Sequence, residues 1–313
     1  MRNGKNHNGA ATKPRVTRRI VADETDTSRL PVLKTYKVFI GGKFPRTESG
    51  RYYLLNDART KQALANICLC SRKDFRDAVV AARAAQAGWA SRAAFNRGQI
   101  LYRIAEMLEG RQGQFIEEMI SQGYAAPAAR AEAAVAVDRV LYYAGWADKY
   151  QQIFSSVNPV ASSHFNFSVL EPTGVVAILC PQESALLGLV STIIPAICGG
   201  NTAIALAGRE LPLGAVTLAE VLATSDLPGG VVNILTGDRT ELLEQFASHM
   251  DVNAVVYCGE DTAQIATIRE KATLNVKRAL VYGKRDWKAA EGQGPYFILN
   301  TQEVKTTWHP IGL

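Results

Sequence analysis

Short apolar runs alternate with longer helical patterns over the second half of the chain. The runs predict strands over 174–179, 202–206, 231–235, 253–257 and 278–282. Apolar residues at helical spacing predict helices over 184–198, 212–224, 239–248 and 262–272. The strands are almost wholly apolar, as burial under helices on both faces requires. This alternation predicts an α/β fold with a Rossmann-type parallel sheet of about five strands.

The first half of the chain predicts a helical region preceded by strands. Alternation over 36–44 leads into a Gly-Gly turn, which predicts a strand entering a hairpin, and a second strand is expected around 65–70. Three helices are expected next, one beginning after Ser71, one over 97–120 and one over 128–154. Gly110 and Gly113 weaken the middle of the second helix.

The net charge of +6 belongs to an N-terminal arm. Residues 1–20 hold six basic residues and no acid, so the rest of the chain sums to zero. The arm has little to bury, which predicts a mobile tail over 1–30. We favour a solvated tail over nucleic-acid binding, because no recognition motif accompanies the charges. No apolar run suggests a membrane span or a secretory signal, so a cytoplasmic location is expected.

The five cysteines, an odd number, do not indicate a disulfide framework. Cys68 and Cys70 form a Cys-x-Cys pair, which is a weak metal signal on its own. Four scattered histidines add no ligand spacing. We therefore expect buried small apolar cysteines and no metal site.

Three segments resemble the aldehyde dehydrogenase superfamily. They are Leu-Glu-Pro-Thr-Gly-Val-Val-Ala-Ile at 170–178, Gly-Gly-Asn-Thr at 199–202 and Asp-Leu-Pro-Gly-Gly-Val-Val-Asn-Ile-Leu-Thr-Gly at 226–237. The resemblance implies an NAD-type domain over 31–155 and 172–284, an oligomerisation hairpin over 156–171, and a linker with a C-terminal oligomerisation strand over 285–313. It implies oligomerisation contacts by Phe165, Phe167, Val169, Val304, Thr306 and Trp308.

Where the resemblance places the family's chemistry, this chain carries other residues. Glu183 stands at the position of the oxyanion-donating Asn, and an ionised carboxylate would repel an oxyanion. We expect Glu183 to cap the following helix instead. Tyr282 stands at the position of the general base, and no acid lies near it in the matching segment. No catalytic residue is therefore expected.

The vestigial cofactor positions implied by the resemblance are Leu206, Arg209, Gly237, Gly259 and Glu260. Leu206 replaces a ribose-binding Lys and offers no donor. Arg209 could attract a 2′-phosphate, but a surface arginine is the favoured interpretation. Glu260 and Asp261 bring two carboxylates to the helix terminus that would meet the pyrophosphate, and they can cap that helix themselves. No cofactor is expected, although weak NAD or NADP binding stays open.

Beyond Lys284 only a short segment precedes 300–308, which resembles the strand that ends family members. The resemblance therefore implies an internal deletion of the domain that holds the nucleophilic Cys. Cys180, the cysteine nearest the site, has no base beside it in sequence, which disfavours a catalytic role.

The resulting hypothesis is a pseudoenzyme subunit that assembles with a complete, catalytic aldehyde dehydrogenase chain, similar to the truncated second half of tandem family members. The alternative is an NAD(P)-binding oxidoreductase or sensor of the same family. A self-dimer through 262–282 also stays open.

Overall fold

A five-stranded parallel sheet forms the centre of the protein, in a computed structural model that describes residues 32–312. The described residues from 33 onward cluster as one compact unit, and the arm predicted over 1–30 lies outside the described residues. The strand order is β10-β9-β6-β7-β8. The strands are β6 (Val175–Leu179), β7 (Thr202–Leu206), β8 (Val232–Leu235), β9 (Ala254–Tyr257) and β10 (Arg278–Val281).

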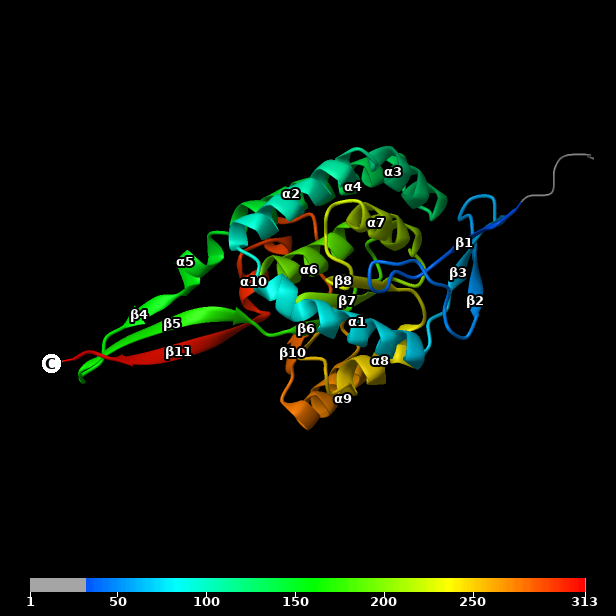
Figure 1. Cartoon of the computed structure of the whole chain (residues 1–313). Coiled ribbons are helices and arrows are strands. Elements are labelled where there is room, and N and C mark those ends of the chain that lie inside the picture. Colours follow the sequence, from blue (N-terminus) through cyan, green and yellow to red (C-terminus); the bar gives the residue numbers. More distant parts are fainter. Residues whose placement is uncertain (1–31, 313) are drawn as a thin grey trace, which may run out of the picture. The chain divides into compact units, whose positions relative to one another are not determined.

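Alternate residues of each central strand enter two separate cores. Val176 and Ile178 of β6 pack into one core, and Val175 and Leu179 pack into the other. The first core includes α6 (Leu187–Cys198) and α7 (Leu213–Ala223), and the second includes α1 (Arg72–Ala90), α8 (Arg239–Ser248) and α9 (Thr262–Ala272). The predicted doubly covered α/β sheet is confirmed (Figure 1).

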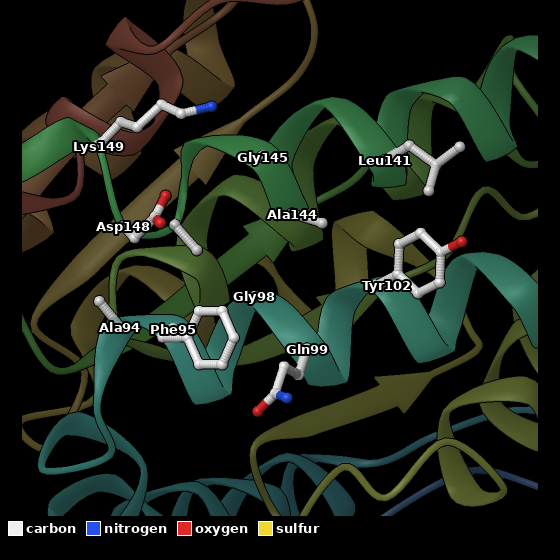
Figure 2. A pocket seen from close by; sticks show the side chains of 11 residues that line it. Ala94, Phe95, Gly98, Gln99, Tyr102, Leu141, Ala144, Gly145, Asp148 and Lys149 are labelled. Carbon is white, nitrogen blue, oxygen red and sulfur yellow. The ribbon is translucent and has the colours of Figure 1, made fainter.

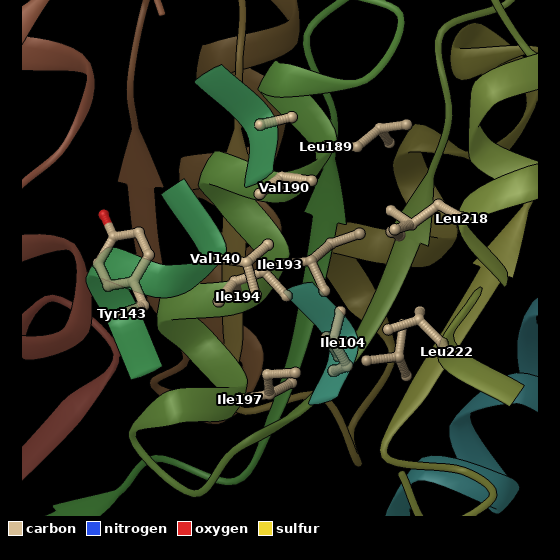
Figure 3. Packing of buried hydrophobic residues seen from close by; sticks show 14 of the residues in the cluster. Ile104, Val140, Tyr143, Leu189, Val190, Ile193, Ile194, Ile197, Leu218 and Leu222 are labelled. Carbon is tan, nitrogen blue, oxygen red and sulfur yellow. The ribbon is translucent and has the colours of Figure 1, made fainter. Parts of the chain in front are cut away.

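Helix α6 is buried at every residue, because a second helical layer covers its outer side. That layer contains α2 (Ala94–Glu109), α3 (Gln112–Ser121) and α4 (Ala126–Trp146). Figure 3 shows Ile104 of α2 and Val140 of α4 against Ile193 and Ile194 of α6. Most side chains in this core are aliphatic, and Trp89, Tyr143 and Tyr150 are among its aromatic members.

Two of the predicted helices are wrong in their extent. The helix expected over 97–120 is two helices, one that ends at Glu109 and one that begins at Gln112. The break falls at Gly110, because glycine has a low helix propensity. The helix expected over 128–154 ends at Trp146, and a short α5 (Tyr150–Phe154) follows. The second break lets Tyr150 become buried, with its hydroxyl 3.5 Å from the carbonyl of Gly199.

A small sheet of order β1-β3-β2 precedes the helices. It contains β1 (Lys34–Tyr36), β2 (Tyr52–Asn56) and β3 (Ala63–Cys68), of which β2 was not predicted. The hairpin expected over 36–44 is reduced to one bridge, Ile40 to Lys43, closed by two glycines with positive φ. The hairpin does not extend, because Phe39 instead bonds the backbone of Ile234 in β8.

The third sheet joins a predicted hairpin to the end of the chain. Its order is β11-β5-β4, with β4 (Ser156–Asn158), β5 (His164–Pro172) and β11 (Gln302–Pro310). β11 pairs antiparallel with β5 over its whole length, from Gln302 opposite Pro172 to Pro310 opposite His164. Residues 282–301, which include α10 (Tyr296–Leu299), connect β10 to β11. None of the helices described over 32–312 has the length and apolar character needed to cross a bilayer.

A buried arginine holds this connection in place. Arg139 of α4 is 2% exposed and donates to the carbonyls of Trp287 (2.7 Å) and Gly292 (2.5 Å). It also donates to the side chains of Gln293 (3.0 Å) and of Ser191 in α6. Burial lowers the pKa of Arg139, but an arginine remains charged in proteins. The carbonyl oxygens therefore solvate a buried cation and tie residues 287–293 to α4 and α6.

Replacing Arg139 by Ala should destabilise the protein by about 3 kcal/mol or more, because several buried acceptors lose their donor at once. The free energy of unfolding in urea would measure the loss. The matched control is Arg103→Ala, where an exposed arginine pairs with Glu106 at 2.9 Å and the expected cost is below about 1 kcal/mol. Equal effects of the two substitutions would contradict this role of Arg139.

Candidate functional site

The strand order identifies where a ligand would bind this sheet. β7 and β8 follow β6 on one side, whereas β9 and β10 lie on its other side. Parallel α/β sheets bind ligands in the crevice outside the carboxyl ends of the strands at such a reversal. The candidate site is therefore the region at the carboxyl ends of β6 and β9, where such folds have their crevice; it is called the switch-point crevice below.

An arginine side chain occupies this crevice. Arg239, the first residue of α8, donates to the carbonyl of Cys258 at 3.0 Å and to the carbonyl of Cys180. These carbonyls belong to the residues that directly follow β9 and β6. The guanidinium also lies over the ring of Tyr257, 5.2 Å from its centroid. Sequence reasoning missed Arg239, because only the fold brings it to both strand ends.

The N-terminus of α6 is capped by a residue that the sequence did not predict. The carboxylate of Glu132, from α4, accepts from the backbone N–H of Leu186 (3.0 Å) and Leu187 (3.2 Å) and from the hydroxyl of Ser184 (2.8 Å). The expectation that Glu183 caps this helix is therefore wrong. Glu183 is exposed, and it is its backbone carbonyl that accepts from Tyr124.

Aspartates cap the two helices that follow β8 and β9. Asp238 accepts from the backbone N–H of Thr240 at 2.8 Å, at the start of α8. The hydrogen bond from the Thr240 hydroxyl contributes most to lowering the pKa of Asp238. Asp261 accepts from the N–H of Ala263 (2.9 Å) and of Gln264 (3.1 Å), at the start of α9. Glu260, beside it, is exposed.

Neither Leu206 nor Arg209 offers an unpaired positive charge to a cofactor. Leu206 ends β7 at 1% exposure and packs in the core shared with α1 and α8. Arg209 pairs with Asp238 at 2.9 Å and lies over the ring of Tyr53. Its guanidinium is thus already neutralised by a carboxylate, as expected of a structural surface arginine.

Both vestigial glycines have structural reasons to be glycine. Gly237 has a φ of +153°, and a Cβ there would lie 3.2 Å from the backbone nitrogen of Cys70. A Cβ on Gly259 would lie 2.8 Å from the hydroxyl of Tyr257. Neither glycine therefore needs a cofactor to explain it.

The structure does not bring Glu183 and Tyr282 into one cavity. Glu183 lines a cavity of about 380 Å³ together with Glu132, Arg285 and Trp287. Tyr282 lines another of about 490 Å³, along β10. Burial raises the pKa of the Tyr282 phenol to about 12, so this residue cannot act as a base near neutral pH.

The cavity in Figure 2 lies between α2 and α4, away from the strand ends. It measures about 410 Å³ and is mainly apolar, with Phe95, Tyr102 and Leu141 on its walls. Small residues such as Gly98 and Ala144 create the hollow, and Asp148 and Lys149 lie at one end. These residues do not form a nucleophile–base pair.

The six predicted oligomerisation residues lie on two faces of the third sheet. Val304, Thr306 and Trp308 stand opposite Leu170, Ser168 and Asn166, whereas Phe165, Phe167 and Val169 stand opposite His309, Thr307 and Lys305. Directly opposed residues of antiparallel strands share a face, so these sets point in opposite directions. The Phe165 and Phe167 rings lie 5.6 Å apart on one face, and Ser168 bonds Thr306 on the other.

Sequence comparisons give related proteins of greater length. The profile of the aldehyde dehydrogenase family matches residues 44–283. Aldehyde dehydrogenase, cytosolic 1 of Elephantulus edwardii is 31% identical over 247 residues, which are 77% of this chain and 49% of that protein. Omega-crystallin of Enteroctopus dofleini is 28% identical, over 80% of this chain and 51% of that protein. The chain spans about half the length of these curated relatives.

Solved structures share the fold. An aldehyde dehydrogenase from Bacillus cereus, solved as an NAD+ complex, has a TM-score of 0.74 and 24% identity, over 79% of this chain and 50% of that chain. Indole-3-acetaldehyde dehydrogenase in its apo form has a TM-score of 0.75 and 23% identity, over 80% of this chain and 59% of that chain. By the family match over most of its length, the chain belongs to the aldehyde dehydrogenase family.

Proposed function

We propose that this chain is a non-catalytic aldehyde dehydrogenase-like subunit that assembles with a complete, catalytic aldehyde dehydrogenase chain. The observation that carries the proposal is the occupation of the anion-binding positions at the sheet's carboxyl edge. Glu132, Asp238 and Asp261 cap the N-termini of α6, α8 and α9. A ligand phosphate at any of these termini would compete with a resident carboxylate.

The cysteines support the absence of a nucleophile. Cys180 and Cys258 are the cysteines nearest the crevice, and both are buried. Burial raises the pKa of Cys180 to about 12 and also raises that of Cys258. Because the thiolate is the attacking form, neither residue is activated toward an aldehyde.

The connection between β10 and β11 supports an internal deletion. The family match ends at Gly283, and β11 begins at Gln302. The residues between them form a short connection with two short helical elements, tied to α4 and α6 through Arg139. We infer that the catalytic part of longer relatives has no counterpart in this connection.

The third sheet offers the surface for assembly. Its outer strands, β11 and β4, have no strand partner on their outer edges within the described residues. Val304 (63%), Trp308 (57%) and Val157 (67%) are largely exposed there. Free edges of this kind pair with strands of another chain, and exposed aromatic side chains add contact area. We propose that a complete aldehyde dehydrogenase supplies the pairing strand.

Titration calorimetry with NAD+ and NADP+ should show no binding tighter than about 1 mM, because the helix termini are already capped. A complete aldehyde dehydrogenase serves as the positive control. Micromolar affinity would contradict the proposal and favour the alternative, an NAD(P)-binding oxidoreductase or sensor.

A chromogenic disulfide reagent at pH 8 should react with none of the cysteines of the native protein, because all five are buried. It should react with all five in the unfolded protein. The absorbance of the released chromophore measures both values. A fast-reacting thiol that disappears in Cys180→Ser would instead indicate an activated nucleophile.

The chain should co-purify with a complete aldehyde dehydrogenase from its native extract, in a complex detected by light scattering. Trp308→Lys should release the partner, because it places a charge on the exposed face of β11. Tyr102→Lys, on α2 and 55% exposed in the parent, is the matched control and should leave the complex intact. A monodisperse monomer without a partner would refute the assembly.

A further inference from the structure

We propose that the switch-point crevice is a binding site for a guanidinium cation, and that its ligand is the chain's own Arg239. The inference deepens the proposed function and rests on it in one respect, namely that the crevice does not serve a dinucleotide. It states which chemical class the crevice accepts in place of a phosphate.

The acceptors of the site come from two neighbouring strands. Leu179 of β6 stands opposite Tyr257 of β9, so Cys180 and Cys258 are the next pair outward. The carbonyls of both cysteines accept from Arg239. Two adjacent carbonyl oxygens fit the two terminal nitrogens of one planar guanidinium and would repel a phosphate oxygen.

A fixed aromatic ring forms the wall of the site. Tyr257 is 1% exposed, and its hydroxyl donates to Gln264 at 3.0 Å. Its face lies beneath the Arg239 guanidinium, where a cation is attracted to the ring quadrupole. The site therefore combines two carbonyl acceptors with a cation–π contact, a set that selects a flat cation.

Charges near the crevice are mixed but favour a cation. The exposed Glu183 and Glu260 lie in the turns that follow β6 and β9. Besides Arg239, Arg285 is the other base near enough to lower the pKa of Cys258. An arginine could in principle attract a phosphate, but both terminal nitrogens of Arg239 already donate to carbonyls. Its Nε is buried and has no acceptor among the described residues. The fit thus rests on the two terminal nitrogens.

Chemical rescue of Arg239→Ala tests the proposal. The substitution should lower Tm by about 5 °C or more, because two carbonyls and the Tyr257 face lose their partner. Millimolar methylguanidinium should then restore part of the loss saturably, whereas methylammonium, which lacks the planar pair of donors, should restore less. The matched control is Arg209→Ala, which removes an arginine from the same edge of the sheet and should show no rescue.

Equal responses of Arg239→Ala, Arg209→Ala and the parent protein to methylguanidinium would overturn the proposal. Stabilisation of Arg239→Ala by NAD+ instead of methylguanidinium would overturn it as well. If Arg239→Ala does not fold, Arg239→Lys replaces it and should show a smaller fall in Tm, since an ammonium cannot bridge both carbonyls as a planar fork does. A Tm of Arg239→Lys equal to that of the parent would refute the two-carbonyl site.

NAD+ titration of the parent protein keeps the two hypotheses apart. Binding of NAD+ to the parent would refute the proposed function and, with it, the claim that the crevice accepts a guanidinium in place of a dinucleotide; rescue by methylguanidinium would then show only the local contact of Arg239. The absence of rescue together with the absence of NAD+ binding would leave the proposed function standing and remove the cation site.

Discussion

The complete burial of α6 imposes a requirement that several distant residues satisfy. A helix leaves unpaired N–H groups at its start and unpaired carbonyls at its end, and α6 cannot expose either to water. Glu132 of α4 accepts from the N–H groups at its start. Arg97 of α2 donates to the carbonyl of Cys198 at its end, at 3.1 Å. An acid at the N-terminus and a base at the C-terminus also match the helix dipole.

The same helix fixes the C-terminal part of the chain through Arg139. This residue joins Ser191 of α6 to the carbonyls of the connection between β10 and β11. Arg285 adds further contacts within this connection, because its guanidinium lies over the rings of Tyr282, Trp287 and Phe297. The connection that leads to β11 is therefore held by the buried Arg139 and the half-buried Arg285, whose partners here are carbonyls and aromatic rings rather than carboxylates.

Strand and helix periodicity was enough to predict the central sheet. Each of its strands is apolar and lies between helices of ordinary length, so local pattern and tertiary burial agree. The pattern failed where tertiary packing decided the outcome. Tyr150 breaks a continuous helical pattern by turning into the core, and β2 is a half-exposed strand without strong alternation.

The candidate site was predictable only in part. Asp261 could be identified as a cap, because an N-cap acts on residues two or three positions ahead in sequence. The roles of Glu132 and Arg239 could not be predicted from the sequence, because each residue contacts its partners only in the folded protein, where α4 and α8 pack beside them. The separation of Phe165 from Trp308 also required the register of β5 with β11.

Under the proposed function, these contacts explain how a nucleotide-type scaffold persists without a nucleotide. The helix termini that bind phosphate groups in such folds carry unpaired N–H groups with or without a ligand. A resident carboxylate satisfies those groups permanently, and an arginine across the ends of β6 and β9 satisfies the carbonyls beside them. Substitutions that remove ligand binding in this way add hydrogen bonds to the ligand-free protein. If the proposed function holds, selection for stability alone would therefore retain the sheet, its glycine turns and its helix caps.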